Sequence, residues 1–233
     1  MSYRSRPLLV VHHLGLGDHI ICNGMVRHLQ GVYRPSTLWL VTTLPYLASV
    51  QFMYRDDPAI RFVPVMNYLE VPGLPLNWYE LDVVRAGYEK LRYPLWDRSF
   101  YEELGLDFDL SWERFFVGRD LEAEAMLARI VDPPRDFALG HRETSEGPMN
   151  LVADTDLPVI EVRRVAGFHL FHWIGLALAA REIHCLDSAF IHLVDRLAPI
   201  REQRLVYHQI RDERHAHFGR KRDWRVIRIL YPD

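Results

Sequence analysis

The chain has 233 residues, 49% of them hydrophobic and 25% charged, which is the composition of a folded globular protein. A formal net charge of −3 argues against a protein that binds nucleic acid over its whole surface. The chain has no apolar run of about 18 residues and no signal-peptide core at its start, so we expect a cytoplasmic protein without a membrane span.

The first part of the chain alternates between predicted strands and predicted helices. Short apolar runs predict strands at residues 7–13, 37–43 and 60–65. Apolar residues at helical spacing predict helices at residues 20–30 and 45–54. Because each pair of strands is separated by a helix, this alternation implies a parallel sheet.

The middle of the chain breaks this alternation. Residues 67–111 contain several prolines, glycines and aromatic residues, and we expect irregular loops there with one helix near residues 79–91. A long amphipathic helix is predicted over residues 112–131. We therefore place the boundary between two domains, residues 1–111 and 112–233, at the start of this helix.

The second domain returns to alternating strands and helices. Strands are predicted at residues 137–140, 159–162, 182–186, 204–208 and 226–229, and helices at residues 168–180 and 188–197. The chain is thus predicted to be an α/β protein with two small halves. Its cysteines, Cys22 and Cys185, lie in apolar surroundings far apart in the sequence and are predicted to be buried thiols.

The segment His12–Ile20, HHLGLGDHI, joins a predicted strand to a predicted helix through a glycine turn. Gly15 and Gly17 let another molecule approach the backbone, and the free amides of the helix start suit an anion or a polar ligand. Asp18 and His19 then lie at the carboxyl edge of the sheet, where open α/β sheets bind ligands. The alternative is that Asp18 only caps the helix, and the two roles are compatible.

Several nucleotide-binding and catalytic motifs are absent from the chain. A dinucleotide fingerprint requires a glycine where the chain has Ile20 and an acidic residue where it has Thr42 and Thr43, so NAD binding is disfavoured. The chain also lacks a P-loop and a nucleophile elbow. The missing third glycine and the missing Tyr-x-x-x-Lys argue against a nucleotide-sugar epimerase.

A second strand-to-helix junction lies at Ile183–Leu197. Asp187 and Ser188 form a natural helix N-cap, Ala189 follows them, and His192 lies one helical turn after Ser188. The amides at this helix start are predicted to bind a diphosphate. The alternative is a plain capped helix with a histidine that faces the core.

A polar loop, HRETSEG at residues 141–147, directly follows another predicted strand. Arg142 is a candidate for holding a phosphate, because the arginine fork can bind phosphate through two hydrogen bonds. Glu143 and Glu146 leave an exposed surface loop as the alternative. The twelve histidines do not follow metal-ligand spacing, so no metal site is predicted.

Together, the two junctions resemble the GT-B glycosyltransferases, most closely the heptosyltransferase-like family. That family opens with a strand and Gly-Asp-x-Ile, as at residues 17–20, and later carries Asp-Thr/Ser-Gly-x-x-His-Leu, similar to residues 187–193. The loop at His141 and Arg142 is also similar to the His-x-Arg loop of GT-B fucosyltransferases, whose arginine holds the donor diphosphate. The resemblance implies two small Rossmann-like lobes that face each other across a cleft, an acceptor-side first domain and a donor-binding second domain.

For function, the resemblance implies a metal-independent, inverting transfer of a sugar from a nucleotide-diphosphate sugar to a hydroxyl group of a carbohydrate acceptor. Asp18 matches the general base of the family, and the helix start at Ser188, with Arg142, stabilises the departing diphosphate. No cofactor is expected, because the nucleotide sugar is the substrate. Two alternatives stay open: a non-catalytic nucleotide- or sugar-binding protein of the same fold, which the short chain favours, and another Rossmann enzyme.

Overall fold

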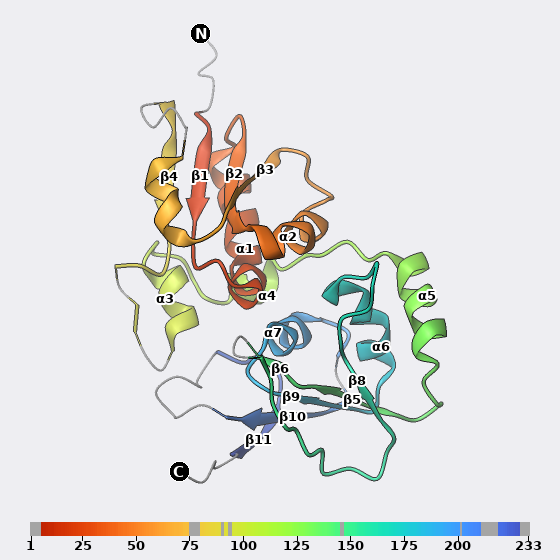
Figure 1. Ribbon diagram of the computed structural model, residues 1–233. Coiled ribbons are helices and arrows are strands. Elements are labelled where there is room, and N and C mark those ends of the chain that lie inside the picture. Colours follow the sequence, from red (N-terminus) through yellow and green to blue (C-terminus); the bar gives the residue numbers. More distant parts are fainter. Residues whose placement is uncertain are drawn as a thin grey trace. The chain divides into compact units, whose positions relative to one another are not determined.

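The computed structural model describes residues 6–74, 80–89, 91–92, 95–144, 147–200, 202–210 and 219–228. The chain forms two compact units, Met1–Gly118 and Arg119–Asp233, drawn in Figure 1. Each unit contains its own parallel sheet, which confirms the predicted α/β class. The expected cleft between two facing lobes stays a prediction.

The first unit contains a four-stranded sheet in the order β3-β2-β1-β4, and all its strand pairs are parallel. Its strands are β1 (Leu8–Val11), β2 (Leu38–Thr43), β3 (Ile60–Val65) and β4 (Asp82–Arg85). Its helices are α1 (Leu16–Tyr33), α2 (Leu47–Met53), α3 (Trp96–Glu102) and α4 (Leu110–Glu113), with 3-10 turns η1 (Leu44–Tyr46) and η2 (Tyr68–Gly73). The chain winds outward from β1 to β3 and then returns to place β4 on the other side of β1. The winding therefore reverses between β1 and β4.

The core of the first unit explains how the carboxyl edge of this sheet is held. Alternate residues of the strands and Val71 of η2 form one buried apolar cluster: Leu9, Val11, Val41, Val65 and Val71. Tyr68 and Tyr88 pack against this cluster from the segments that follow β3 and β4. The loops beyond the strands are thus fixed to the core rather than left free in solvent.

Two predictions for the middle of the chain are wrong. The sequence predicts a helix near residues 79–91, but Asp82–Arg85 form strand β4, which pairs with β1; residues 79 and 90 lie outside the described residues. The run Val83-Val84 is β-branched and so favours a strand over a helix. The long helix expected at 112–131 is two separate helices, α4 and α5 (Leu121–Val131). Asp120 begins the second one, because its side chain accepts a hydrogen bond from the backbone of the first turn at 3.0 Å.

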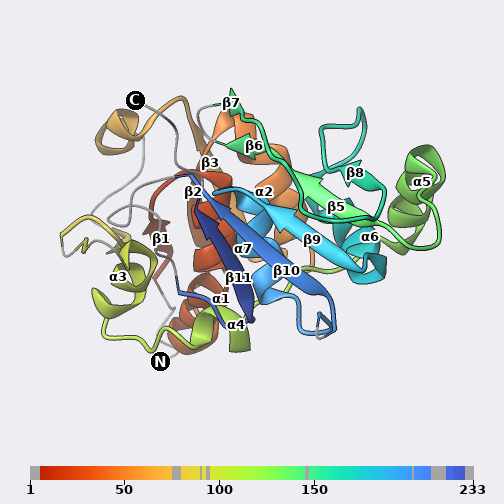
Figure 2. The same ribbon diagram turned by 90° about the horizontal axis from the view of Figure 1, so that it is seen from below.

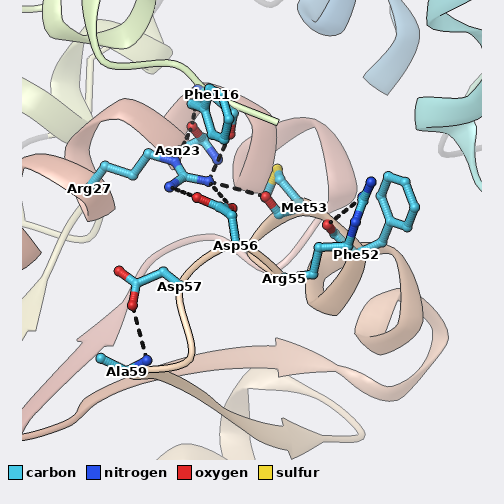
Figure 3. A network of polar contacts seen from close by, with 9 residues as sticks. All are labelled: Asn23, Arg27, Phe52, Met53, Arg55, Asp56, Asp57, Ala59 and Phe116. Atoms are coloured by element: carbon cyan, nitrogen blue, oxygen red, sulfur yellow. Dashed lines mark hydrogen bonds and ion pairs between the residues drawn. The ribbon is translucent and has the colours of Figure 1, made fainter. Parts of the chain in front are cut away.

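Arg27 on α1 fastens the end of the first unit to its helices (Figure 3). Its guanidinium donates to both carboxylate oxygens of Asp56 and to the carbonyl oxygen of Phe116, all at 2.9 Å. Asn23 on the same helix accepts a hydrogen bond from the backbone nitrogen of Phe116, also at 2.9 Å. These contacts extend the first unit past residue 111, where the sequence predicts the domain boundary.

The second unit contains a five-stranded parallel sheet in the order β11-β10-β9-β5-β8 (Figure 2). Its strands are β5 (Ala138–His141), β8 (Val159–Glu161), β9 (Glu182–Cys185), β10 (Arg204–Gln209) and β11 (Trp224–Arg228). Its helical segments are α5, η4 (Leu170–Trp173), α6 (Ile174–Ala179) and α7 (Ala189–Arg196). The HRETSEG loop enters a small antiparallel hairpin of β6 (Glu143–Thr144) and β7 (Gly147–Pro148). In this sheet the winding reverses between β5 and β9.

Two further features of the chain bear on the sequence predictions. Cys22 and Cys185 are both buried free thiols, as predicted. Among the described residues, no helix combines the length and the hydropathy that crossing a membrane requires.

Candidate functional site

Both junctions that the sequence singles out lie where the winding of a sheet reverses. In the first sheet, the segment after β1 carries Asp18, and the neighbouring strand β4 leads into Gly87 and Tyr88. In the second sheet, His141 ends β5 and Ser188 follows the neighbouring strand β9. Segments that leave such a pair of strands diverge from each other, and the crevice between them is where open α/β sheets bind ligands.

Asp18 lies in the first turn of α1. Gly15 is the N-cap residue, and its backbone nitrogen donates a hydrogen bond to Asp18 Oδ2 at 3.1 Å, so the carboxylate does support the helix start. Burial raises the pKa of Asp18 to about 7, against the opposing effect of this hydrogen bond. A Cβ atom on Gly15 would lie 2.7 Å from the same carboxylate oxygen and would displace it. The absence of a side chain at Gly15 therefore leaves room for the carboxylate of Asp18 in this position.

Two buried histidines lie beside this helix start. The rings of His12 and His19 are both inaccessible to solvent and meet edge to face, with their centroids 4.5 Å apart. Within the described residues, His12 Nε2 and both ring nitrogens of His19 have no hydrogen-bond partner. Burial lowers the pKa of His12 to about 4 and that of His19 well below its usual value, so both rings are neutral. The side chain of His19 thus packs inside the unit, and its backbone lies in α1, where its amide donates to the carbonyl oxygen of Gly15 at 3.1 Å.

The turn after β4 is tied to the segment after β1. The hydroxyl of Tyr88 donates to the carbonyl oxygen of His12 at 2.8 Å, and a ring nitrogen of His13 lies 2.8 Å from the carbonyl oxygen of Gly87. The carboxylate of Glu103 accepts hydrogen bonds from three consecutive backbone nitrogens of this turn at 2.7–3.1 Å. The segments that follow β1 and β4 are therefore joined by a network of hydrogen bonds.

The sequence did not predict that the turn after β4, with Gly87 and Tyr88, lies next to the segment after β1. Tyr88 stacks on Tyr68, with ring centroids 4.6 Å apart, and the charge of Asp18 contributes to raising the pKa of Tyr88, after the larger effect of burial. Sequence analysis assigned this region to a helix, which hid the strand end that precedes it. The available signal was Gly87, three residues after the β-branched pair Val83-Val84, because a glycine suits the turn after a strand and this one has a φ of +83°.

In the second unit, the structure brings His141 and Ser188 together. His141 Nδ1 lies 2.9 Å from Ser188 Oγ, which links the carboxyl ends of β5 and β9. Ser188 is the N-cap of α7, but its hydroxyl forms no bond to the helix amides. Burial lowers the pKa of His141 to about 4, so its ring is neutral near pH 7. Ala189 is the first residue of α7, at the end that offers free backbone amides.

The other predicted donor residues have partners inside this unit. The guanidinium of Arg142 holds the carboxylate of Glu161 through Nε to Oε1 at 3.1 Å and Nη2 to Oε2 at 2.6 Å. Asp187 accepts a short hydrogen bond from the hydroxyl of Tyr207. His192 is buried on α7, and burial lowers its pKa well below the usual value. Arg142 is thus at the predicted sheet edge, with one edge of its guanidinium engaged by a neighbouring strand.

An open cavity of about 720 Å³ lies elsewhere in the first unit. Thr37, Ile60 and Phe62 are among its lining residues, which places it at the amino ends of β2 and β3. None of the predicted site residues lines it, and Asp18 lies at the opposite edge of the sheet. Across the described ranges, no group of three His, Cys, Asp or Glu side chains is placed to hold a metal ion.

Among the comparisons with known proteins, only the comparison with solved structures finds matches. No protein-family model matches the chain, and no curated protein matches its sequence. The crystal structure of a glycosyl transferase family 9 protein from Veillonella parvula DSM 2008 is similar with a TM-score of 0.58 and 11% identity, over 100% of this chain and 90% of that chain. Two structures of the iron-containing dodecameric glycosyltransferase TibC, one from enterotoxigenic E. coli H10407 and one described as a heptosyltransferase in complex with ADP-D-β-D-heptose, have TM-scores of 0.49. Their identities are 15% and 12%, and each match covers 90% of this chain and 59% of that chain.

The match to the Veillonella protein extends over the whole chain and bears on its fold. It agrees with two parallel sheets whose strand orders are those of Rossmann-like domains. The chain therefore has the Rossmann-like α/β fold of a family 9 glycosyltransferase.

Proposed function

We propose that the protein is an inverting glycosyltransferase that moves a sugar from a nucleotide-diphosphate sugar to a hydroxyl group of a carbohydrate acceptor. The observation that carries this proposal is the half-buried carboxylate of Asp18 at the reversal point between β1 and β4. The likeness to a family 9 glycosyltransferase supports the fold that such an enzyme needs.

Asp18 has the properties of a general base for this reaction. A catalytic base works best when its pKa lies near the operating pH, and burial brings the pKa of Asp18 to about 7. In the proposed step, the ionised carboxylate takes the proton of the acceptor hydroxyl while the oxygen attacks the anomeric carbon. The bond from that carbon to the diphosphate breaks on the opposite face, so the configuration inverts and the negative charge leaves with the nucleoside diphosphate.

The second unit supplies the groups that the leaving diphosphate needs. The start of α7 offers backbone amides and the positive end of a helix dipole. The hydroxyl of Ser188 and the ring of His141 lie together at the same edge, and Arg142 follows His141 directly. In this proposal these groups stabilise the developing charge without a metal ion. Asp187 directly precedes Ser188, and His192 lies four residues after it on α7.

The proposal is tested by incubating the chain with ADP-, GDP- and UDP-sugars. Release of the nucleoside diphosphate is measured with and without carbohydrate acceptors, in EDTA and in added Mg²⁺, and the anomeric configuration of any product is read by NMR. Turnover of one donor in EDTA with inversion supports the proposal. A donor that binds and is never cleaved or transferred would assign the chain to the non-catalytic alternative, and retention of configuration would exclude the role of Asp18.

A further inference from the structure

The pair of Arg142 and Glu161 occupies the part of the second unit that the proposed function assigns to the donor diphosphate. Arg142 follows β5 and Glu161 ends β8, and the parallel register of these strands sets Gly140 opposite Glu161. The Nε and Nη2 atoms of the guanidinium both donate to the carboxylate, at 3.1 Å and 2.6 Å. This is the same two-pronged contact that a phosphate group makes with arginine.

The ion pair is accessible to a ligand. The side chains of Arg142 and Glu161 are 42% and 40% exposed. Ion pairs with this much exposure contribute little to folding, because water competes for both partners. Arg142 is also the direct neighbour of His141, whose ring lies 2.9 Å from Ser188 Oγ at the start of α7. Arg142 is therefore next in sequence to the residue that contacts this helix start, and a carboxylate of β8 holds its guanidinium.

We propose that Glu161 occupies the Arg142 fork when no donor is bound, and that the diphosphate of a nucleotide displaces it. This inference rests on the proposed function for the identity of the ligand. Glu161 is then a built-in competitor that lowers the affinity for a nucleoside diphosphate and favours ligands with enough negative charge to replace a carboxylate. A diphosphate as a whole carries more negative charge than a single carboxylate, and its oxygens fit the same fork, so the exchange is expected to favour the ligand.

A second arrangement, in which Glu161 helps Arg142 to bind the phosphate, predicts the opposite effect on nucleotide affinity. If Glu161 instead oriented Arg142 so that its other N–H groups held the phosphate, removal of the carboxylate would loosen the arginine and weaken binding. The sign of the effect of Glu161→Gln on nucleotide affinity therefore separates the two arrangements.

The experiment is calorimetry with ADP, GDP and UDP on the whole chain. Glu161→Gln is expected to tighten binding about three- to tenfold, and Arg142→Ala is expected to weaken it about tenfold or more. The gain from Glu161→Gln is expected to vanish in the Arg142→Ala background, because the fork that it frees is then missing. Glu143→Gln is the matched control: it removes the same charge from the residue directly after Arg142, and Glu143 lies 3.8 Å from Arg164 rather than on the Arg142 fork.

Each outcome decides the inference. Weaker binding in Glu161→Gln, a gain that persists without Arg142, or an equal gain in Glu143→Gln would overturn it, and so would the absence of nucleotide binding in both wild type and Glu161→Gln. If the expected affinities are found but no donor is turned over, the inference stands and the proposed function fails.

Discussion

The two reversal points present different chemistry at equivalent places in two sheets. After β1 and β4, the first unit offers the carboxylate of Asp18 beside the neutral rings of His12 and His19. After β5 and β9, the second unit offers the hydroxyl of Ser188 with the ring of His141 and a helix start. In the proposed function, the carboxylate of Asp18 accepts a proton and the groups of the second set bind negative charge. The strand orders of the two sheets differ, but each sheet has a reversal point, and under this proposal the side chains after the strands decide which task each edge performs.

The largest expected effect is on the first edge. Asp18→Asn is expected to lower sugar transfer about 10²–10⁴-fold, which is the usual contribution of a general base. The fold is expected to persist, because the asparagine side-chain oxygen can still accept the hydrogen bond from Gly15. Transfer rates, nucleotide affinity and melting temperature are measured on the same samples. An unchanged nucleotide affinity with lost transfer supports separate roles for the two sheet edges. Loss of both would show that Asp18 is also needed for nucleotide binding.

Acid is expected to unfold the second unit before the first. In the second unit, burial lowers the pKa of His141 and His208 to about 4. Below about pH 6.5 these side chains therefore bind protons in the unfolded state but stay neutral in the folded state. Stability therefore falls as the pH is lowered from about 6.5 to about 4, by about 1.4 kcal/mol per unit of pKa difference for each group. Burial also lowers the pKa of His184 and His192, which adds to this effect in the second unit. His12, His13 and His19 act in the same direction in the first unit, but Asp18 opposes them there. With its pKa raised to about 7, Asp18 binds a proton in the folded state that the unfolded state releases above about pH 4.

This difference is measured by urea unfolding at pH 7.5 and pH 5, with pulse proteolysis and mass spectrometry to assign the fragments. Earlier cleavage in the second unit at pH 5 is expected. Cleavage that begins in the first unit at pH 5 would contradict the opposing effect of Asp18.

The shape of the first edge is expected to depend on Gly87. Gly87→Ala places a Cβ atom 2.1 Å from the ring of Phe100 on a backbone with φ of +83°, so it combines backbone strain with overpacking. Gly105→Ala is the matched control, with φ of +67° and no atom within 4 Å of the added Cβ. We expect Gly105→Ala to cost about 1–2 kcal/mol of unfolding free energy, and Gly87→Ala about 1–3 kcal/mol more. If urea unfolding shows the same loss of unfolding free energy for both variants, the turn after β4 can accommodate the added Cβ atom beside Phe100.

The smallest expected effect is on the second edge. Ser188→Ala removes the contact with His141 and one polar group from the predicted diphosphate site. A neutral hydrogen bond contributes about 0.5–1.5 kcal/mol, so nucleoside diphosphate affinity is expected to fall about two- to tenfold. Ser188→Thr keeps the hydroxyl and is expected to bind like the wild type. Calorimetry on both variants checks this, and equal weakening by threonine and alanine would assign the effect to packing instead.

The sequence predicts much of the fold because most strands are short apolar runs that end at turns. The spacing of β1, β2 and β3 and the glycine turn before α1 are visible as local patterns, and so is the N-cap at Ser188. Strand β4 was missed because its partner, β1, lies about seventy residues earlier, and local periodicity does not contain that pairing. The contact of Arg142 with Glu161 was missed for the same reason, since the register of β5 against β8 brings them together. Local signals thus located Asp18 after β1 and both His141 and Ser188 in the second unit, and tertiary pairing supplied the segment after β4 and the contact of Arg142 with Glu161.

The most direct test of Asp18 as the base is the pH dependence of kcat/KM for sugar transfer between pH 5.5 and 8.5, with the folded state checked at each pH. We expect the rate to rise about tenfold per pH unit well below pH 7 and to level off above it, because the ionised carboxylate is the reactive form. In Asp18→Asn, the residual rate is expected to lose this inflection. A wild-type rate that does not change across this range, or an inflection near pH 7 that survives in Asp18→Asn, would contradict the assignment.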